Sequence, residues 1–155
     1  MNLTQSSHFV INNDTVMGGF SSSRIDHKKD HVIFSGVVSL ENNGGFASVQ
    51  CDIPSPTKVV NQCIIKVNGD GKRYQLRLKT AQLKYGEAYV AEFSTLAGQV
   101  TEHIFIASDF QLSFRGRDIN TGPELQFSDV EKVGWLIANK QQGNFNISLY
   151  SIEFA

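Results

Sequence analysis

The side chains that could carry acid–base, nucleophilic or metal chemistry include four histidines, two cysteines and 15 acidic residues. None of the histidines stands in the His-Glu-x-x-His spacing of a metalloprotease, and no serine lies in a Gly-x-Ser-x-Gly elbow. His103 follows Glu102 in an extended run, so the two side chains point to opposite faces and cannot act as a base with its orienting acid. We therefore expect no enzyme, although a triad assembled from distant residues leaves no mark on a sequence.

Two glycine-rich segments, 12–19 and 69–73, could present backbone N–H groups to an oxyanion. Neither contains Gly-Lys-Ser/Thr and neither opens a helix, so they do not predict a phosphate loop. Asp70-Gly71 is instead typical of a hairpin turn. The run Arg115-Gly116-Arg117 offers two guanidiniums as a fork for a carboxylate or phosphate, and the alternative is a turn whose arginines pair with Asp118.

Metal and sugar ligands have weaker signals. Calcium takes scattered oxygen ligands, for which the candidates are Asp14, Asp118 and Glu153; nothing clusters them, so we expect neither a metal nor a cofactor. Sugar binding needs an exposed aromatic platform. Trp135 lies in a run that is apolar on both faces and is expected in the core, which leaves Tyr85 and Tyr89 as platforms.

Composition excludes several partners. The formal net charge of −1 provides no basic stripe for nucleic acid and no polybasic patch for a membrane surface. The first residues have neither the features of a secretory signal nor those of a mitochondrial presequence, which favours a cytoplasmic location. The balanced total could still hide a local concentration of arginine at Arg73, Arg115 and Arg117.

Period-two alternation is the dominant pattern. In Tyr74–Thr80 the apolar Tyr74, Leu76 and Leu78 face one way and the polar residues the other, as in a half-buried strand. Similar runs occupy 31–40, 46–53, 63–67, 89–95, 100–106, 110–114, 133–138 and 145–154. Together they predict a single all-β domain over residues 1–155, a sandwich or barrel, with at most a turn of helix near 56–61 and with Cys51 and Cys63 as buried free thiols.

Six ordered segments resemble one family, the complex I intermediate-associated protein 30 family. They begin at Asn13, Phe34, Glu41, Gly69, Phe114 and Gly134 and read NDTVMGGxS, FSG, ENNGGFAS, GDGKRY, FRGR and GW followed by KQQGNF. The resemblance runs from about residue 9 to residue 154. It implies a jelly-roll β-sandwich of the galactose-binding-like type, with two antiparallel sheets and little helix.

The resemblance further implies a non-enzymatic module that recognises a protein partner, such as a respiratory complex subunit or assembly intermediate. The alternative is a module that binds carbohydrate or another small ligand. In one interpretation the motif residues shape strand-to-turn transitions; in the other, Asn13, Asp14, Asn43, Arg73 and Arg115 converge on one face as a binding site. The candidate binding residues are Asn13, Asp14, Met17, Gly18, Gly19, Ser21, Asn43, Gly44, Gly45, Phe46, Asp70, Arg73, Tyr74, Arg115 and Arg117.

Overall fold

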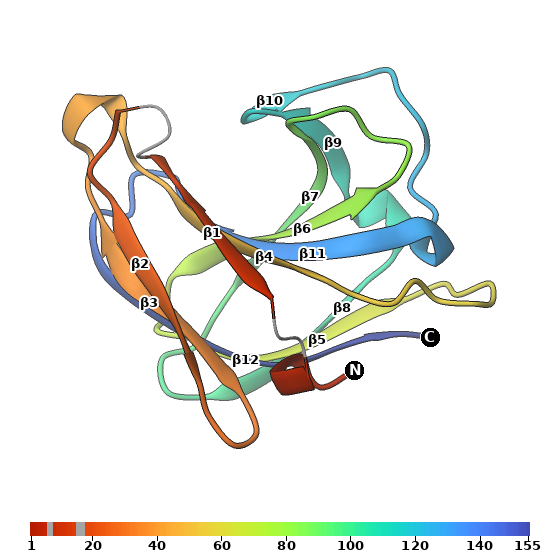
Figure 1. The fold of residues 1–155 in the computed structure, drawn as a ribbon, viewed down its shortest axis with the longest axis horizontal. Coiled ribbons are helices and arrows are strands. Elements are labelled where there is room, and N and C mark those ends of the chain that lie inside the picture. Colours follow the sequence, from red (N-terminus) through yellow and green to blue (C-terminus); the bar gives the residue numbers. More distant parts are fainter. Residues whose placement is uncertain (6–7, 15–17) are drawn as a thin grey trace.

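Two antiparallel β-sheets pack face to face in the computed structural model, which describes residues 1–5, 8–14 and 18–155 (Figure 1). The seven-stranded sheet contains, in spatial order, β1 (Phe9–Asn13), β4 (Ala47–Asp52), β11 (Val130–Ile137), β6 (Arg73–Thr80), β7 (Glu87–Ser94), β9 (Gln111–Phe114) and β10 (Arg117–Asp118). The five-stranded sheet contains β2 (Ser22–His27), β3 (Val32–Val38), β12 (Gly143–Phe154), β5 (Cys63–Asn68) and β8 (Val100–Phe105). This confirms the predicted all-β sandwich.

Alternating side chains of both sheets meet in the core. Along β6, Tyr74, Leu76 and Leu78 are buried, and Leu76 lies opposite Trp135 of β11, whose side chain is also fully buried. Removing side chains of this size from water stabilises the fold by roughly 1.5–3 kcal/mol each. Trp135 is therefore a core residue, as predicted.

The predicted strands correspond to those observed within a few residues, but three strands escaped prediction: β1, β2 and β10. β1 and β2 have burial patterns without a clean alternation, because β1 lies at a sheet edge and β2 at an edge of the other sheet. β10 has only two residues and both are exposed. Edge strands bury little surface, so their sequences need not alternate.

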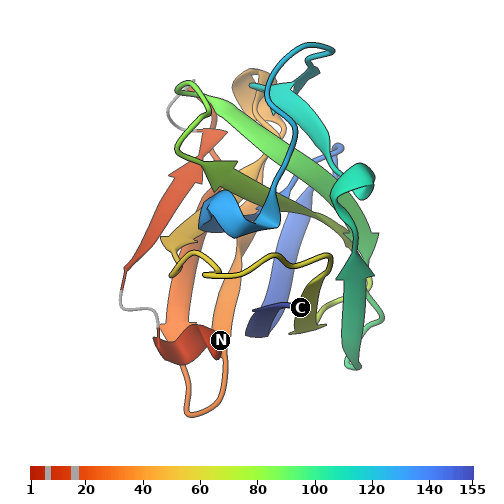
Figure 2. The same cartoon turned by 90° about the vertical axis from the view of Figure 1, so that its right-hand side faces the viewer.

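The predicted turn of helix near residues 56–61 is wrong. The backbone N–H groups of Asn61 and Gln62 donate to Ala155 O at 2.8 and 2.9 Å, so this segment pairs with the end of the chain. The described helical turns are instead short 3₁₀ turns: η1 (Leu3–Gln5), η3 (Glu41–Asn43), η4 (Ala107–Asp109) and η5 (Phe127–Asp129). The two ends of the chain lie close together, since the Met1 amino group donates to Ile152 O at 2.8 Å (Figure 2).

The glycine-rich connections cross between the sheets. The segment with Asp70-Gly71 joins β5 of the five-stranded sheet to β6 of the seven-stranded sheet, so the hairpin predicted there is wrong. The β1–β2, β3–β4 and β11–β12 connections also change sheet. A crossing of this kind needs the same turn residues as a hairpin, which is why sequence alone does not separate them.

Candidate functional site

Asp14 lies at the centre of a buried network where the β1–β2 and β3–β4 connections meet. Its carboxylate accepts hydrogen bonds from Ser21 N (2.9 Å), Ser21 Oγ (2.6 Å), Gly45 N (2.7 Å) and Phe46 N (3.3 Å), and the residue is 1% exposed. Burial alone would raise the pKa of Asp14, but these hydrogen bonds outweigh it and hold the pKa below its usual range. The carboxylate is thus ionised and used internally.

Two glycines of the motif are required by this carboxylate. A Cβ on Gly44 would lie 2.5 Å from Asp14 Oδ2, and one on Gly19 would overlap the same carboxyl group. Asn13 has a similar internal role, since its Oδ1 accepts from Ser23 Oγ at 3.0 Å and from Ser48 N at 3.3 Å. These contacts explain the Asn-Asp and Gly-Gly motifs by the geometry of the corner.

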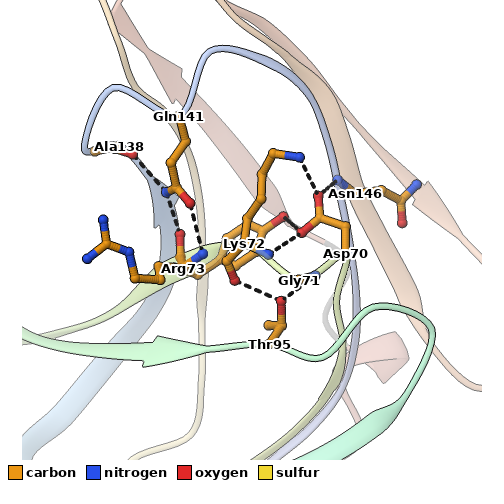
Figure 3. A network of polar contacts seen from close by, with 9 residues as sticks. Asp70, Gly71, Lys72, Arg73, Thr95, Ala138, Gln141 and Asn146 are labelled. Carbon is orange, nitrogen blue, oxygen red and sulfur yellow. Dashed lines mark hydrogen bonds and ion pairs between the residues drawn. The ribbon is translucent and has the colours of Figure 1, made fainter.

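A second network surrounds Asp70 at the β5–β6 crossing (Figure 3). Asp70 Oδ1 accepts from Lys72 N and Tyr74 OH, at 3.1 and 3.0 Å, while Oδ2 accepts from Asn146 N of β12 at 2.8 Å. Thr95 Oγ1 donates to Lys72 O at 2.7 Å, which joins the end of β7 to the same corner. Burial and the nearby Asp70 charge raise the pKa of the Tyr74 hydroxyl, which keeps it protonated as a donor.

Gln141 connects this network to the β11–β12 crossing. Its amide accepts from Arg73 N at 2.9 Å and donates to Arg73 O and Ala138 O, both at 2.8 Å (Figure 3). Residues 138–140 also line a hollow of about 390 Å³ beside Asp14, together with Gly44, Gly45 and Phe46. The β11–β12 connection therefore lies beside both networks. The backbone of Arg73 is fixed there, whereas its side chain is exposed.

Arg115 and Arg117 lie elsewhere. Arg115 and Gly116 have φ values of 49° and 83°, as in the tight turn that joins β9 to β10, and the Arg115 guanidinium lies 5.2 Å from the Phe114 ring centre. β9 and β10 end the seven-stranded sheet opposite to β1 and β4, so these arginines do not join the Asp14 network. Within the described part of the chain neither arginine pairs with Asp118, contrary to the alternative considered above.

Placement of the remaining candidates is mixed. Asn43 belongs to η3, Gly18 has a φ of 88°, and Met17 falls outside the described residues. Tyr89 is buried with its hydroxyl donating to Pro123 O at 2.6 Å, so it cannot be the sugar platform predicted, whereas Tyr85 is 91% exposed.

His103 and both cysteines lie on the inner side of the sandwich. His103 contacts Phe93 and Thr101, with ring centroids 4.9 Å apart and an Nε2–Oγ1 distance of 2.9 Å, and burial lowers its pKa. Both Cys51 and Cys63 are buried, and burial raises the pKa of the Cys63 thiol to about 12. Cys63, with no exposed surface, lacks the access that a reactive thiol needs, whereas His103 is partly exposed and has Thr101 as its polar partner.

Sequence reasoning missed the outer face of the seven-stranded sheet, defined by the outward positions of its strands. Across the sheet, register aligns Gln50 of β4, Gly134 of β11, Arg77 of β6, Val90 of β7 and Gln111 of β9 in one row. The signal was present, since the alternation of Tyr74–Thr80 places Gln75, Arg77 and Lys79 away from the core. None of the paired outward positions holds an aromatic residue.

A second hollow, of about 570 Å³, lies on the outer side of the five-stranded sheet. Its lining consists mainly of hydroxyl, amide and charged side chains: Ser22, Ser23, Arg24, Ser35, Asp70, Lys72, Asn144 and Asn146, with Gly36, Val37 and Phe145. Within the described ranges, no group of three His, Cys, Asp or Glu residues lies close enough to hold a metal ion. No described helix is long and apolar enough to span a membrane.

Comparison with known proteins gives a family and a fold. The sequence matches the family described as Complex I intermediate-associated protein 30 over residues 2–149. No curated protein matches the sequence.

Among solved structures, a family 11 carbohydrate-binding module from Clostridium thermocellum, in complex with a β-1,3-1,4-mixed-linked tetrasaccharide, is similar with a TM-score of 0.60 and 14% identity, covering 95% of this chain and 86% of that one. A family 29 module from Piromyces equi has a TM-score of 0.52 and 8% identity over 93% and 78%. The agarase AgWH50C has a TM-score of 0.62 and 9% identity over 94% of this chain but only 22% of the enzyme.

Proposed function

Because the chain belongs to the Complex I intermediate-associated protein 30 family, we propose that it is a non-catalytic binding module that holds a protein partner during assembly of respiratory complex I. The observation that carries the proposal is the outer face of the seven-stranded sheet. Its paired outward positions carry amide, hydroxyl, charged and aliphatic side chains, with no aromatic platform for a sugar ring. Arginine, which this face carries at Arg77, is enriched in protein–protein interfaces.

The fate of the motif carboxylates supports a non-catalytic role. Asp14 and Asp70 each accept three or more hydrogen bonds from backbone N–H and side-chain hydroxyl groups, which leaves them occupied as structural acceptors. A general acid or base must reach a substrate proton, and neither group is free to do so.

Deletion of the gene in its own organism tests the proposal. Membrane extracts are separated on native gels and stained for NADH dehydrogenase activity, and we expect the deletion to reduce fully assembled complex I, with recovery on re-expression of the wild-type chain. An epitope-tagged chain should co-purify with complex I subunits from the assembling strain. A deletion strain with a normal content of complex I would contradict the assembly role.

Carbohydrate binding is a second candidate, favoured by the hollow on the five-stranded sheet with its hydroxyl and amide lining. Such groups are the usual partners of sugar hydroxyls, and the fold is shared with carbohydrate-binding modules. A glycan array with the wild-type chain and Asn144→Ala decides this candidate. Binding that Asn144→Ala abolishes supports it, and an array without signal removes it.

A further inference from the structure

Three cations stand together on the outer face of the seven-stranded sheet. Arg77 and Lys79 occupy successive outward positions of β6, about 7 Å apart along the strand, and Lys132 of β11 lies directly opposite Lys79 in the register. Like charges at opposed positions of neighbouring strands repel and destabilise a sheet. The arrangement therefore has a cost that the fold must balance elsewhere.

Only one of these cations is neutralised within the fold. Lys132 Nζ forms an ion pair with Asp52 Oδ1 at 2.6 Å. Among the residues that the structure describes, no carboxylate lies within 4 Å of Arg77 or Lys79, and Arg77 Nη1 donates instead to the uncharged Gln75 Oε1 at 3.2 Å. Glu92 is the other acid facing this region from β7, and it contacts Asn139 at 3.5 Å.

The residues paired with Arg77 on the two neighbouring strands carry no polar side chain. Its cross-strand neighbours are Gly134, which has no side chain, and the aliphatic Val90. Arg77 and Lys79 are both partly buried, and burial lowers the pKa of each side chain. The positive charges of Arg77 and Lys132 lower the pKa of Lys79 further. Half-buried cations are screened less by salt than exposed ones, so a matching anion gains more there.

We propose that Arg77 and Lys79 bind the carboxylates of an acidic, extended segment of the protein partner, an inference that rests on the proposed function. A guanidinium can donate two parallel hydrogen bonds to one carboxylate, so Arg77 supplies a directional contact and Lys79 a second positive charge. Alternate residues of an extended peptide repeat about every 7 Å, which matches the spacing of the two cations on β6.

The test uses the full chain and a fluorescein-labelled peptide of alternating Glu and Ser, with fluorescence anisotropy as the readout. We expect saturable binding that weakens with salt, and a loss of affinity of about tenfold or more for Arg77→Gln and for Lys79→Gln. The control is the double variant Lys28→Gln/Lys29→Gln in the exposed β2–β3 turn of the other sheet. It removes two positive charges, more than either single β6 variant, and its affinity should still change less than about twofold. Thermal melts confirm folding, and Arg77→Lys, which keeps the charge, should retain partial binding.

Three results would overturn the inference: equal weakening by the control and the β6 variants, equal affinity for the peptide with Gln in place of Glu, or tighter binding of a heparin octasaccharide lost in the same β6 variants. The last would assign the face to an anionic glycan. Absence of peptide binding in a chain whose deletion still reduces complex I would refute this inference alone and leave the proposed function standing. A normal complex I content with specific peptide binding would refute only the assembly role.

Discussion

Replacing Asp14 by Ala should be among the most destabilising single changes in this chain. The substitution leaves the Ser21 and Gly45 N–H donors and the Ser21 hydroxyl without their acceptor in a buried corner. Hydrogen bonds to a charged group are worth about 1.5–3 kcal/mol each and are not additive, so we expect a loss of about 3–4 kcal/mol in the free energy of unfolding. For a chain of this size that lowers Tm by about 6–16 °C.

A double-mutant cycle with Gly44→Ala makes the reasoning specific. The added Cβ would lie 2.5 Å from Asp14 Oδ2, whereas its next contacts, the carbonyl oxygens of Glu41 and Ser39, lie at 3.0 Å. Once Asp14 is Ala the main clash is gone, so Gly44→Ala should cost at least about 1 kcal/mol less in that background than in the wild type.

The assay is urea unfolding followed by fluorescence of Trp135, the single and fully buried tryptophan. Asp118→Ala serves as the control, because this exposed acid on β10 should change stability by less than about 0.5 kcal/mol. Two results would refute the view that the Gly-Gly motif exists to fit this carboxylate. One is an Asp14→Ala variant that is no more destabilised than Asp118→Ala. The other is a double variant whose loss of unfolding free energy equals the sum of the losses in Asp14→Ala and Gly44→Ala.

Three further predictions follow from the same geometry. The pKa of Asp14 is lowered in the folded state, so the ionised carboxylate stabilises the fold above the unfolded pKa of about 4, and this stabilisation is lost as pH falls through the folded pKa. The difference in unfolding free energy between wild type and Asp14→Asn should therefore narrow in acid. A constant difference in urea titrations from about pH 5 to 2 would contradict this. Burial lowers the pKa of His103, so the wild type should lose stability as pH falls from about 7 to 5, and His103→Phe should lose less over the same range. Thermal melts in which Tm falls equally with pH for both proteins would contradict this. With a thiol pKa of about 12 and no exposure, Cys63 should react with iodoacetamide near pH 8 only in denaturant, and peptide mapping that finds rapid modification of the native protein would show the site to be open.

Strand positions were predictable because burial imposes alternation. The buried sequence of β6 and its neighbours repeats with period two, and the structure follows it almost residue by residue. The edge strands β1 and β2 have less to bury and gave no such pattern. What alternation cannot give is which strands pair, so the crossing at Asp70-Gly71 was taken for a hairpin although β5 and β6 belong to different sheets.

The motif residues were found from the sequence, but their role depends on spatial neighbours. Asp14 is 31 residues from its partner Gly45, and Asp70 is 76 residues from Asn146, so neither network is legible locally. Both interpretations of the motifs stayed open for that reason, and the contacts observed favour the structural one. In the sequence, Arg77 and Lys79 are only the polar positions of an alternating strand and belong to no motif. They become part of a charged cluster through the strand register, which places Lys132 of β11 opposite Lys79.

The most direct test of the account is complementation of the deletion strain with variants of the outer face of the seven-stranded sheet. Assembled complex I is quantified on activity-stained native gels in strains that express the wild-type chain, Arg77→Gln/Lys79→Gln or Lys28→Gln/Lys29→Gln at equal levels. We predict full recovery with the wild type and the Lys28/Lys29 control, and a recovery reduced by at least about half with the Arg77/Lys79 variant. Full recovery with the Arg77/Lys79 variant would contradict the claim that this face holds the partner.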